Sequence, residues 1–524
     1  MSHAQHYQSS SVPVHGDPMA AAVRVARGAG GLPFVLYERH GTWSVALGAA
    51  VEIAVTPDAV RRKGPGGERV VPWRGHPGPA LRELTADLPV EDWTAYGTAA
   101  FELAYAGTPA HAELPPDAVL LRLIVPRTEV RVHGDTAVVR ALDPGDRTTA
   151  AAVAALADTA EEAGPELVAV DPEAGDGELY RKAVHTAVRE IQDGGLRKVI
   201  LSRVVPVPEP VDLPATYLHG RRRNTPARSF LLGIGGLRAA GFSPEIVVAV
   251  DTAGRVSTQP LAGTRALTGE PEQDARLRGD LLGDAKEVYE HAVTVHTAFE
   301  ELGEVCAAGS VRVREYMAVK PRGSAQHLGS ELYGTLAPGK DGWDALAALF
   351  PAVTVSGIPK PEAYDAIRRL ETEPRGLYGG AVFTLAADGG FDAALVLRSI
   401  FQCAGRTWLR AGAGVVGQSR PAREFAETCE KLRSVAGSVV RAAPPDVLGL
   451  DLMRRDIAEA LRVPESAVDD ETSLIVQGLD SVGLMTVVSK WSAYGVRLKL
   501  ADLARDPRLA AWARLVRDRQ AAAG

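Results

Sequence analysis

Four glutamates occur in two pairs whose members are three residues apart. Glu287 and Glu290 lie in DAKEVYEHA, and Glu424 and Glu427 lie in AREFAETCEKL. Residues three apart share one face of a helix, so each pair presents two carboxylates in the same direction. Two such faces opposite each other would offer the hard oxygen ligands that Mg2+ prefers. The simpler interpretation is a solvated helix surface, because Glu427 and Lys431 also have the i,i+4 spacing of an ordinary ion pair.

A second chemical signal is Ser481, which follows Gly-Leu-Asp and begins an apolar-periodic stretch. Leu484, Val488 and Trp491 recur there at helical spacing, which places the serine at the head of a short helix. Such a serine is either an N-cap that accepts a backbone N–H or an exposed hydroxyl that another enzyme modifies.

The pattern along the chain predicts the elements that position these residues. The segment TEVRVHGDTAVVRAL alternates around 133–135 and predicts a hairpin. Further strands are predicted in RKVILSRVVPV, EIVVAVD, FDAALVLRSIFQ and RTWLRAGAGVVG, and helices in the segments that carry the glutamate pairs. Strands grouped with intervening helices indicate an α+β body.

The chain divides at a stretch with consecutive prolines, RAAPPDVLG, which must interrupt any helix before it. We expect a flexible N terminus over 1–20, one large domain over 21–440, a linker over 441–448 and a small domain over 449–524. Leu450, Met453, Ile457 and Leu461 form an amphipathic stripe in the last part, and DPRLAAWARLV forms another. These short helices predict a small all-α, four-helix bundle.

Composition excludes several classes of protein. The net charge of -7 argues against general nucleic-acid binding. Three cysteines without metal-finger spacing argue against a disulfide framework. The N terminus has no signal-peptide pattern, and no apolar run reaches the roughly 18 residues of a membrane span. We therefore expect a cytoplasmic protein that interacts with neither membrane nor nucleic acid.

Many separate motifs occur together and in order over roughly residues 25–440. They include PLAGTRA, SPE, KEVYEH, RGSAQHLGS, ALFPAVTVSGIPK, RGLYGG, FDAALVLRS, AGAGVV and REFAETCEKL. This set resembles the chorismate-utilising enzymes, most closely their salicylate synthase branch. The resemblance implies a large α/β sandwich and Mg2+-dependent conversion of chorismate through isochorismate to salicylate and pyruvate.

The resemblance also implies an acid and a base for exchanging one ring hydroxyl for another. Lys198 is expected to activate the incoming water, and Glu245 to protonate the departing hydroxyl. Lys198 must then be partly neutral, which burial beside other cations would favour. Taken alone, Lys198 could be a charge at a strand edge and Glu245 a turn residue after Pro244.

Metal and substrate contacts follow from the same resemblance. Glu290 and Glu427 match direct Mg2+ ligands, and Glu287 and Glu424 match ligands acting through water. Arg398 and Tyr378 match the residues that hold the enolpyruvyl carboxylate, for which a guanidinium is well suited. Further contacts match Gly263, Thr264, His327, Thr354, Gly412 and Lys431; His327 is equally compatible with a structural role.

Water rather than ammonia is the expected nucleophile. No amidotransferase domain is visible in the chain, and Ala262 occupies a position that is lysine in similar aminodeoxychorismate enzymes. Lys198 is the water-activating lysine that anthranilate enzymes lack. The sequence departs from salicylate synthases at Lys320-Pro321 and in GQSRPARE, which leaves the matched catalytic positions intact.

The C-terminal GLDS motif resembles an aryl carrier protein. Ser481 would carry 4'-phosphopantetheine. A phosphopantetheinyl transferase would attach it and would contact Asp480 beside the serine. Loading an aryl acid requires a separate adenylating ligase, and a downstream synthetase or synthase would accept the product. Two alternatives stay open: an isochorismate synthase with the same carrier, and a catalytically silent scaffold that presents the carrier. We expect the synthase to be monomeric.

Overall fold

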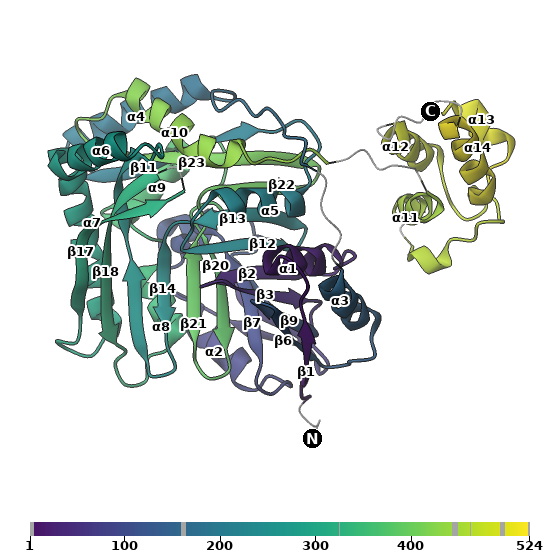
Figure 1. The fold of residues 1–524 in the computed structure, drawn as a ribbon, viewed down its shortest axis with the longest axis horizontal. Coiled ribbons are helices and arrows are strands. Elements are labelled where there is room, and N and C mark those ends of the chain that lie inside the picture. The colour runs from purple at the N-terminus through teal and green to yellow at the C-terminus, as the bar shows by residue number, and fades with distance from the viewer. Residues whose placement is uncertain are drawn as a thin grey trace. The chain divides into compact units, whose positions relative to one another are not determined.

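The computed structural model describes residues 5–158, 164–323, 325–442, 449–461, 463–492 and 498–521. The chain forms two compact units, Met1–Arg441 and Ala442–Gly524 (Figure 1). Most of the expected linker, including Pro444 and Pro445, lies outside the described residues. No helix in the described part of the chain is long and apolar enough to cross a membrane.

The first unit contains two large antiparallel sheets. The 11-stranded sheet has the order β1 (Gln8–Pro13), β10 (Thr136–Ala141), β9 (Thr128–His133), β3 (Thr42–Leu47), β2 (Phe34–Arg39), β12 (Arg228–Ile234), β13 (Leu237–Ser243), β22 (Ser399–Cys403), β23 (Arg406–Val415), β11 (Lys198–Pro206), β19 (Gly357–Ile358). The 12-stranded sheet has the order β16 (Leu261–Ala266), β18 (Ala325–Thr335), β15 (Arg255–Gln259), β14 (Ile246–Val250), β21 (Phe391–Leu395), β20 (Ala381–Ala386), β7 (Thr94–Ala99), β8 (Leu121–Val125), β4 (Val51–Val55), β5 (Ala59–Gly64), β6 (Gly67–Pro72), with β17 (Arg312–Arg322) paired to β18.

Strands of the two sheets run in crossing directions, as β13 and β14 do in Figure 1. The layer between the sheets is a core that includes Phe230, Phe401, Tyr96 and Val382, each at most 1% exposed. Alternation of apolar residues along each strand supplies this layer, since successive side chains point to opposite faces. The α+β sandwich expected from the sequence is confirmed.

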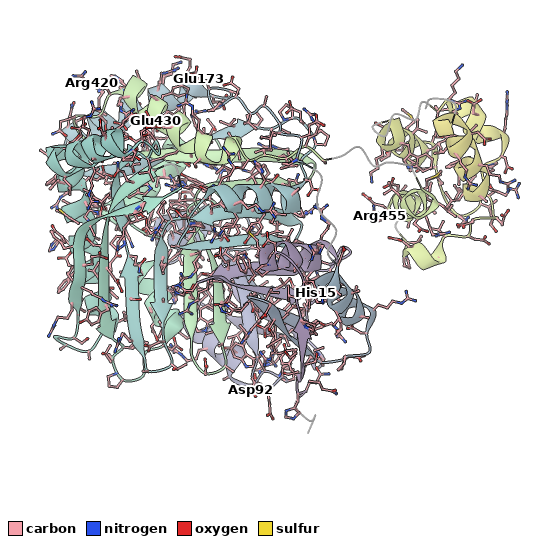
Figure 2. The ribbon with its side chains drawn as sticks, in the orientation of Figure 1. His15, Asp92, Glu173, Arg420, Glu430 and Arg455 are labelled. Atoms are coloured by element: carbon pink, nitrogen blue, oxygen red, sulfur yellow. The ribbon has the colours of Figure 1, made fainter. Side chains whose placement is uncertain are left out.

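Helices cover the outer faces of the sheets. They are α1 (Pro18–Arg27), α2 (Gly78–Ala86), α3 (Arg147–Ala157), α4 (Gly177–Gln192), α5 (Leu213–Arg223), α6 (Pro271–Gly283), α7 (Ala285–Val305), α8 (Gly342–Leu349), α9 (Lys360–Leu370) and α10 (Pro421–Ala436), with 3-10 turns η1 (Phe101–Tyr105) and η2 (Pro109–Glu113). The glutamate pairs lie on α7 and α10. Arg420, which precedes α10, and Glu430 within it are labelled in Figure 2.

The expected hairpin at 133–135 is present. β9 and β10 pair from His133 to Thr136 across Gly134 and Asp135, and Gly134 takes the positive φ that such a two-residue turn requires.

A flexible N terminus was expected over 1–20, but residues 8–13 and 18–20 of this segment form regular structure. Gln8–Pro13 forms β1 by pairing with β10, and Asp17 caps α1 by accepting the backbone N–H of Met19 at 2.9 Å. The polar composition of this segment suggested disorder, but the edge of β10 supplies partners for its backbone groups.

The second unit is a bundle of α11 (Leu450–Leu461), α12 (Ser481–Ser492), α13 (Leu500–Arg505) and α14 (Leu509–Ala521), with a 3-10 turn η3 (Glu465–Ala467). Its core includes Met453, Ile457, Trp491 and Trp512. The indoles of Trp491 and Trp512 meet edge to face at 5.9 Å, and Trp491 Nε1 donates to Asp456 Oδ2 at 3.0 Å. The expected four-helix bundle is confirmed.

Candidate active site

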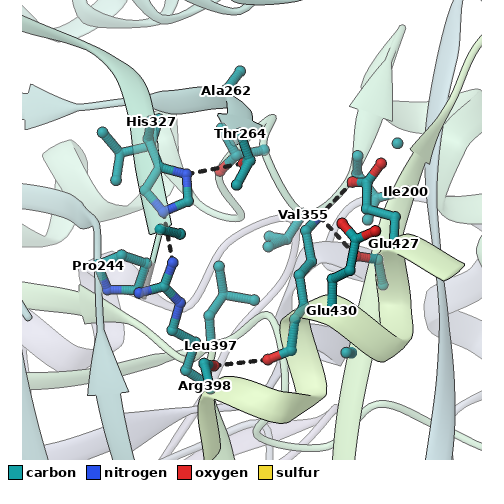
Figure 3. Close-up of a pocket in the computed structure, with 18 of the residues that line it drawn as sticks. Ile200, Pro244, Ala262, Thr264, His327, Val355, Leu397, Arg398, Glu427 and Glu430 are labelled. Carbon is teal, nitrogen blue, oxygen red and sulfur yellow. Dashed lines mark hydrogen bonds and ion pairs between the residues drawn. The ribbon is translucent and has the colours of Figure 1, made fainter. Parts of the chain in front are cut away.

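One cavity of about 620 Å3 in the first unit gathers almost all of the predicted site residues (Figure 3). Its walls come from β11, β16, β23, α7 and α10, which are far apart in the sequence. The predicted residues that line it are Lys198, Glu245, Gly263, Thr264, Glu287, Glu290, His327, Thr354, Tyr378, Arg398, Gly412, Glu427 and Lys431. Glu424 does not line the cavity and is 1% exposed behind it.

Lys198 begins β11 and is 4% exposed. Its Nζ lies 2.8 Å from Glu290 Oε1 on α7, an ion pair without hydrogen-bond geometry. The resemblance requires a partly neutral lysine, which neighbouring cations would favour, but the charged group that contacts Lys198 is a carboxylate. The edge of the sheet faces the acidic side of α7, so the charged neighbour of Lys198 is a carboxylate.

Glu245 lies on the loop between β13 and β14 and is 2% exposed. Burial raises the pKa of its carboxyl to about 8, although the hydrogen bond from Thr354 lowers it. Thr354 Oγ1 donates to Glu245 Oε1 at 2.7 Å. At neutral pH the carboxyl is therefore protonated and can give up a proton.

Arg398, His327 and Thr264 form a hydrogen-bonded chain along one wall (Figure 3). Arg398 Nη2 lies 2.5 Å from His327 Nε2, and His327 Nδ1 lies 2.9 Å from Thr264 Oγ1. A guanidinium can only donate, so Nε2 accepts and the imidazole proton sits on Nδ1. Burial, with repulsion from Arg398, places the pKa of His327 well below its usual value. The histidine is neutral and orients Arg398.

Arg398 is a half-buried cation without a carboxylate partner among the described residues. Burial, with repulsion from Arg322, lowers its pKa to about 10. Its backbone has a positive φ of 49°, which is uncommon for a residue other than glycine. An anion in the cavity would supply the missing counter-charge.

Lys431 lies on α10 and connects that helix to β23. Its Nζ lies 2.9 Å from Glu427 Oε1 and donates to the carbonyl of Gly412 at 3.0 Å. A Cβ at Gly412 would lie 2.8 Å from the carbonyl oxygen of Leu201 and 3.1 Å from the phenolic oxygen of Tyr378. Glycine is therefore required for β23 to approach β11 and for Tyr378 to keep its place.

The four acidic residues face each other across α7 and α10, and each has a cationic partner. Lys286 Nζ on α7 lies 3.7 Å from Glu424 Oε1 on α10, which links the two helices. Arg265 Nη1 lies 3.4 Å from Glu287 Oε1. Burial, with repulsion between the acids, raises the pKa values of Glu287 and Glu424. The ion pair with Lys431 overcomes burial and lowers the pKa of Glu427.

These residues suit Mg2+ in their chemistry. Among the described residues, no three histidine, cysteine or acidic side chains converge closely enough to hold a metal ion. Each of the four carboxylates is paired instead with a cation of the chain. Glu424 Oε2 is buried and has no hydrogen-bond partner in the described part of the chain. A buried oxygen of this kind needs a partner, which a bound cation or an ordered water molecule can provide.

Four arginines that line the cavity were not singled out from the sequence: Arg265, Arg410, Arg423 and Arg433. Arg265 lies within the PLAGTRA motif, and Arg410 interrupts the apolar strand TWLRAGAGV. A charged residue within a strand of otherwise buried residues was the available signal, because burial of a cation requires partners.

Ser481 is the first residue of α12 and is exposed. Asp480 caps this helix instead, since its Oδ1 accepts the backbone N–H of Gly483 at 2.7 Å. No hydrogen bond involves the Ser481 hydroxyl among the described residues. The interpretation of Ser481 as a structural N-cap is therefore wrong, and its hydroxyl is accessible.

A family model described as chorismate binding enzyme matches residues 33–437. The chain belongs to the chorismate-binding enzyme family. A second model, described as phosphopantetheine attachment site, matches residues 451–516. The chorismate-binding unit therefore precedes a carrier-type unit, as the motifs indicated.

Individual relatives agree with this assignment. A salicylate synthase of Mycolicibacterium paratuberculosis is 43% identical over 434 residues, which is 82% of this chain and 95% of that relative. Anthranilate synthase component 1 of Streptomyces coelicolor is 41% identical over 268 residues, 50% of this chain and 52% of that relative. The chain thus spans about half the length of the anthranilate relative.

Solved structures show the same fold. MenF, the menaquinone-specific isochorismate synthase of Escherichia coli, has a TM-score of 0.63 at 23% identity and covers 83% of this chain and 95% of its own. A putative 2,3-dihydroxybenzoate-specific isochorismate synthase, DhbC, of Bacillus anthracis has a TM-score of 0.60 at 22% identity and covers 79% of this chain and 99% of its own.

Proposed function

We propose that the first unit is a Mg2+-dependent salicylate synthase and that the second is an aryl carrier with 4'-phosphopantetheine on Ser481. The first unit would convert chorismate through isochorismate to salicylate and pyruvate. The observation that carries this proposal is that one cavity contains both a lysine at the start of a strand and a buried glutamic acid whose pKa is raised to about 8. The 43% identity to a salicylate synthase supports the choice of product.

The first step exchanges one ring hydroxyl for another. Lys198 would act in its neutral form, which requires that Glu290 binds the metal rather than the lysine. It removes a proton from a water molecule as the water oxygen forms a bond to a ring carbon. The ring double bond shifts, and the hydroxyl at another ring carbon leaves as water after taking the proton of Glu245. One water enters and one leaves, so the step is an isomerisation. The base and the acid must act at different positions of the ring. Lys198 and Glu245 come from different segments that line one cavity, which allows this.

Binding of a dicarboxylate needs two anchoring regions. Arg398, oriented by His327 and Thr264, and the phenol of Tyr378 would hold the enolpyruvyl carboxylate. Lys431 and the backbone at Gly412 and Gly263 would border the ring and its carboxylate. Gly263 has a φ of +81°, and a Cβ there would lie 3.2 Å from Glu287 Oε2, so only glycine leaves this corner open.

Glu290 and Glu427 would hold Mg2+ directly, with Glu287 and Glu424 acting through water. The ion would neutralise and orient the ring carboxylate of the substrate. The second step, loss of pyruvate, requires orientation of the enolpyruvyl group rather than a dedicated acid or base. The walls that anchor the carboxylates supply that orientation.

The carrier unit requires enzymes that this mechanism does not provide. A phosphopantetheinyl transferase would modify Ser481, and an ATP-dependent ligase would activate the aryl acid before it reaches the thiol. Salicylate is released as a free acid, so the two units act in sequence through that ligase. A downstream synthetase or synthase would take the thioester, as in siderophore or other natural-product biosynthesis in the cytoplasm.

Incubation with chorismate and Mg2+ tests the synthase assignment. We expect salicylate, detected by its fluorescence, together with an equal amount of pyruvate. Isochorismate without pyruvate would instead assign the unit as an isochorismate synthase with a carrier. Complete absence of turnover by folded protein would indicate a silent scaffold.

A further inference from the structure

A buried charge cluster lies at one wall of the cavity and takes no part in the chemistry above. Arg375, Glu371 and Arg410 form it, with side chains 1%, 4% and 2% exposed. Glu371 Oε1 lies 2.6 Å from Arg375 Nη2, and Glu371 Oε2 lies 2.6 Å from Arg410 Nη2. Glu371 Oε1 also accepts the backbone N–H of Ser202 at 2.7 Å. Two cations therefore share one anion.

A second acidic residue, Glu102, contacts the backbone near this cluster rather than its guanidinium groups. Glu102 accepts the backbone N–H groups of Arg375 at 2.7 Å and of Gly376 at 3.2 Å. Burial raises the pKa of this carboxyl, which opposes its ionisation. Among the described residues, Glu371 is therefore the one carboxylate that pairs with the two guanidinium groups.

Both arginines lie against Tyr378. The Cζ atoms of Arg410 and Arg375 are 5.6 Å and 5.9 Å from the centre of its ring. Cations at this distance are attracted to an aromatic ring and restrict its position. Tyr378 lines the cavity, as does Arg410.

The arginines also connect the backbone of the site. Arg375 donates to the carbonyls of Val355 at 2.5 Å and Ile200 at 2.7 Å. Val355 follows Thr354, and Ile200 lies two residues after Lys198 on β11. One guanidinium group therefore joins the segment that carries Thr354, the hydrogen-bond donor to Glu245, to the strand that carries Lys198.

Arg410 has little freedom to reach into the cavity. Its Nε donates to Ser202 Oγ at 2.9 Å, and its Nη1 donates to the carbonyl of Pro374 at 2.7 Å. It can act on a substrate through Tyr378 and through its charge, but its donors are committed to the protein.

We propose that Arg410 and Arg375 are positioning residues that make the Tyr378 side of the cavity selective for a second carboxylate on the substrate. They fix the Tyr378 ring and direct positive charge toward the anion that Arg398 and Tyr378 receive. Two buried guanidinium groups that share one carboxylate are costly in a low-dielectric region, and an arriving carboxylate offsets that cost. This inference rests on the proposed function, because it assumes that a dicarboxylate is the substrate.

The test compares two unreactive probes that differ in one carboxylate, 3-(carboxymethoxy)benzoate and 3-methoxybenzoate. Their dissociation constants are measured by calorimetry or ligand NMR on the full chain, for wild type, Arg410→Met and Arg410→Lys. Arg406→Met is the matched control, because Arg406 lies on the same strand and is 62% exposed. Circular dichroism and thermal unfolding establish that each variant is folded.

We expect Arg410→Met to weaken binding of the dicarboxylate about tenfold and to change binding of the methoxy probe less than about twofold. Arg410→Lys keeps the charge and should lie between Arg410→Met and wild type, and Arg406→Met should match wild type. With chorismate, Arg410→Met should raise KM about tenfold and affect kcat less.

Equal weakening of both probes would show that Arg410 only supports the fold, and no weakening of either would also overturn the inference. If Arg410→Met does not fold, the same comparison is made with Arg410→Lys, where a larger loss for the dicarboxylate is still expected. Turnover of chorismate by the wild type is measured in parallel. A wild type that binds the dicarboxylate but does not convert chorismate would overturn the proposed function and leave this inference standing.

Discussion

Thr354 Oγ1 donates a 2.7 Å hydrogen bond to Glu245 Oε1 inside the cavity. The bond orients a carboxyl whose pKa burial has raised to about 8. A group in this state is protonated at neutral pH and held toward the substrate, as a general acid must be. The threonine sets how far the shift extends, because its hydrogen bond favours the ionised form.

The rate of isochorismate formation should fall as pH rises through about 8, because Glu245 then loses the proton that it must donate. Thr354→Val removes the hydrogen bond that lowers this pKa, so the descending limb should move to higher pH. The measurement is a pH–rate profile of kcat from pH 6 to 10 for both proteins. A limb that stays in place or moves to lower pH in the variant would contradict the assignment of Glu245.

Glu245→Gln should abolish isochorismate formation and make the first unit more stable at alkaline pH. The folded pKa is near 8 and the ordinary value is 4.5, so the folded state binds the additional proton. The free energy of unfolding of the wild type therefore falls by roughly several kcal/mol as the pH rises from 4.5 to about 8. The variant lacks this loss. Denaturant unfolding at pH 5 and pH 9 measures the free energy of unfolding of both proteins. If the wild type and the variant differ by the same amount at both pH values, Glu245 is not a buried, neutral carboxyl.

Lys198→Ala should reduce turnover of chorismate by about 100-fold or more and affect pyruvate release from supplied isochorismate much less. In the proposed mechanism Lys198 acts in the first step alone, so the two substrates separate its contribution. Lys182→Ala, on the exposed surface of α4, is the control. Equal losses on both substrates would remove the proposed role of Lys198 as the base.

Glu290→Gln and Glu427→Gln should each eliminate Mg2+-dependent turnover without unfolding the protein, because each removes one negative oxygen from the proposed metal site. Binding of Mn2+ in the presence of chorismate, followed by electron paramagnetic resonance, gives a readout independent of rate. Glu300→Gln on the same helix α7 is the control, since Glu300 is 65% exposed. Near-normal Mn2+ binding by either variant would disprove the ligand assignment.

Ser481→Ala should prevent attachment of phosphopantetheine by a transferase, whereas Thr486→Ala on the same helix should not. Mass spectrometry of the intact protein measures the addition. Salicylate formation should be unchanged in Ser481→Ala and in a chain ending at Arg441, where the first compact unit ends. A salicyl adduct on Ser481 after incubation with chorismate alone would contradict the requirement for a separate ligase.

Sequence alone determined the elements and most of the residues of the site. Periodicity places apolar residues on strands and helices, and the ordered motifs indicated that Lys198, Glu245 and Arg398 belong to one cavity. The hairpin at Gly134 and the terminal helical bundle were predictable for the same reason, because turn geometry and amphipathic spacing are local properties.

Tertiary structure decided the properties that depend on neighbours distant in the sequence. The charge beside Lys198 is Glu290 because β11 faces α7, and the proton of Glu245 is retained because two sheets exclude water around it. Order in the N-terminal segment depends on the free edge of β10. Helical spacing could not show that Asp480, rather than Ser481, caps α12. Burial and electrostatic energies are sums over residues brought together by folding, so the pattern along the chain does not contain them.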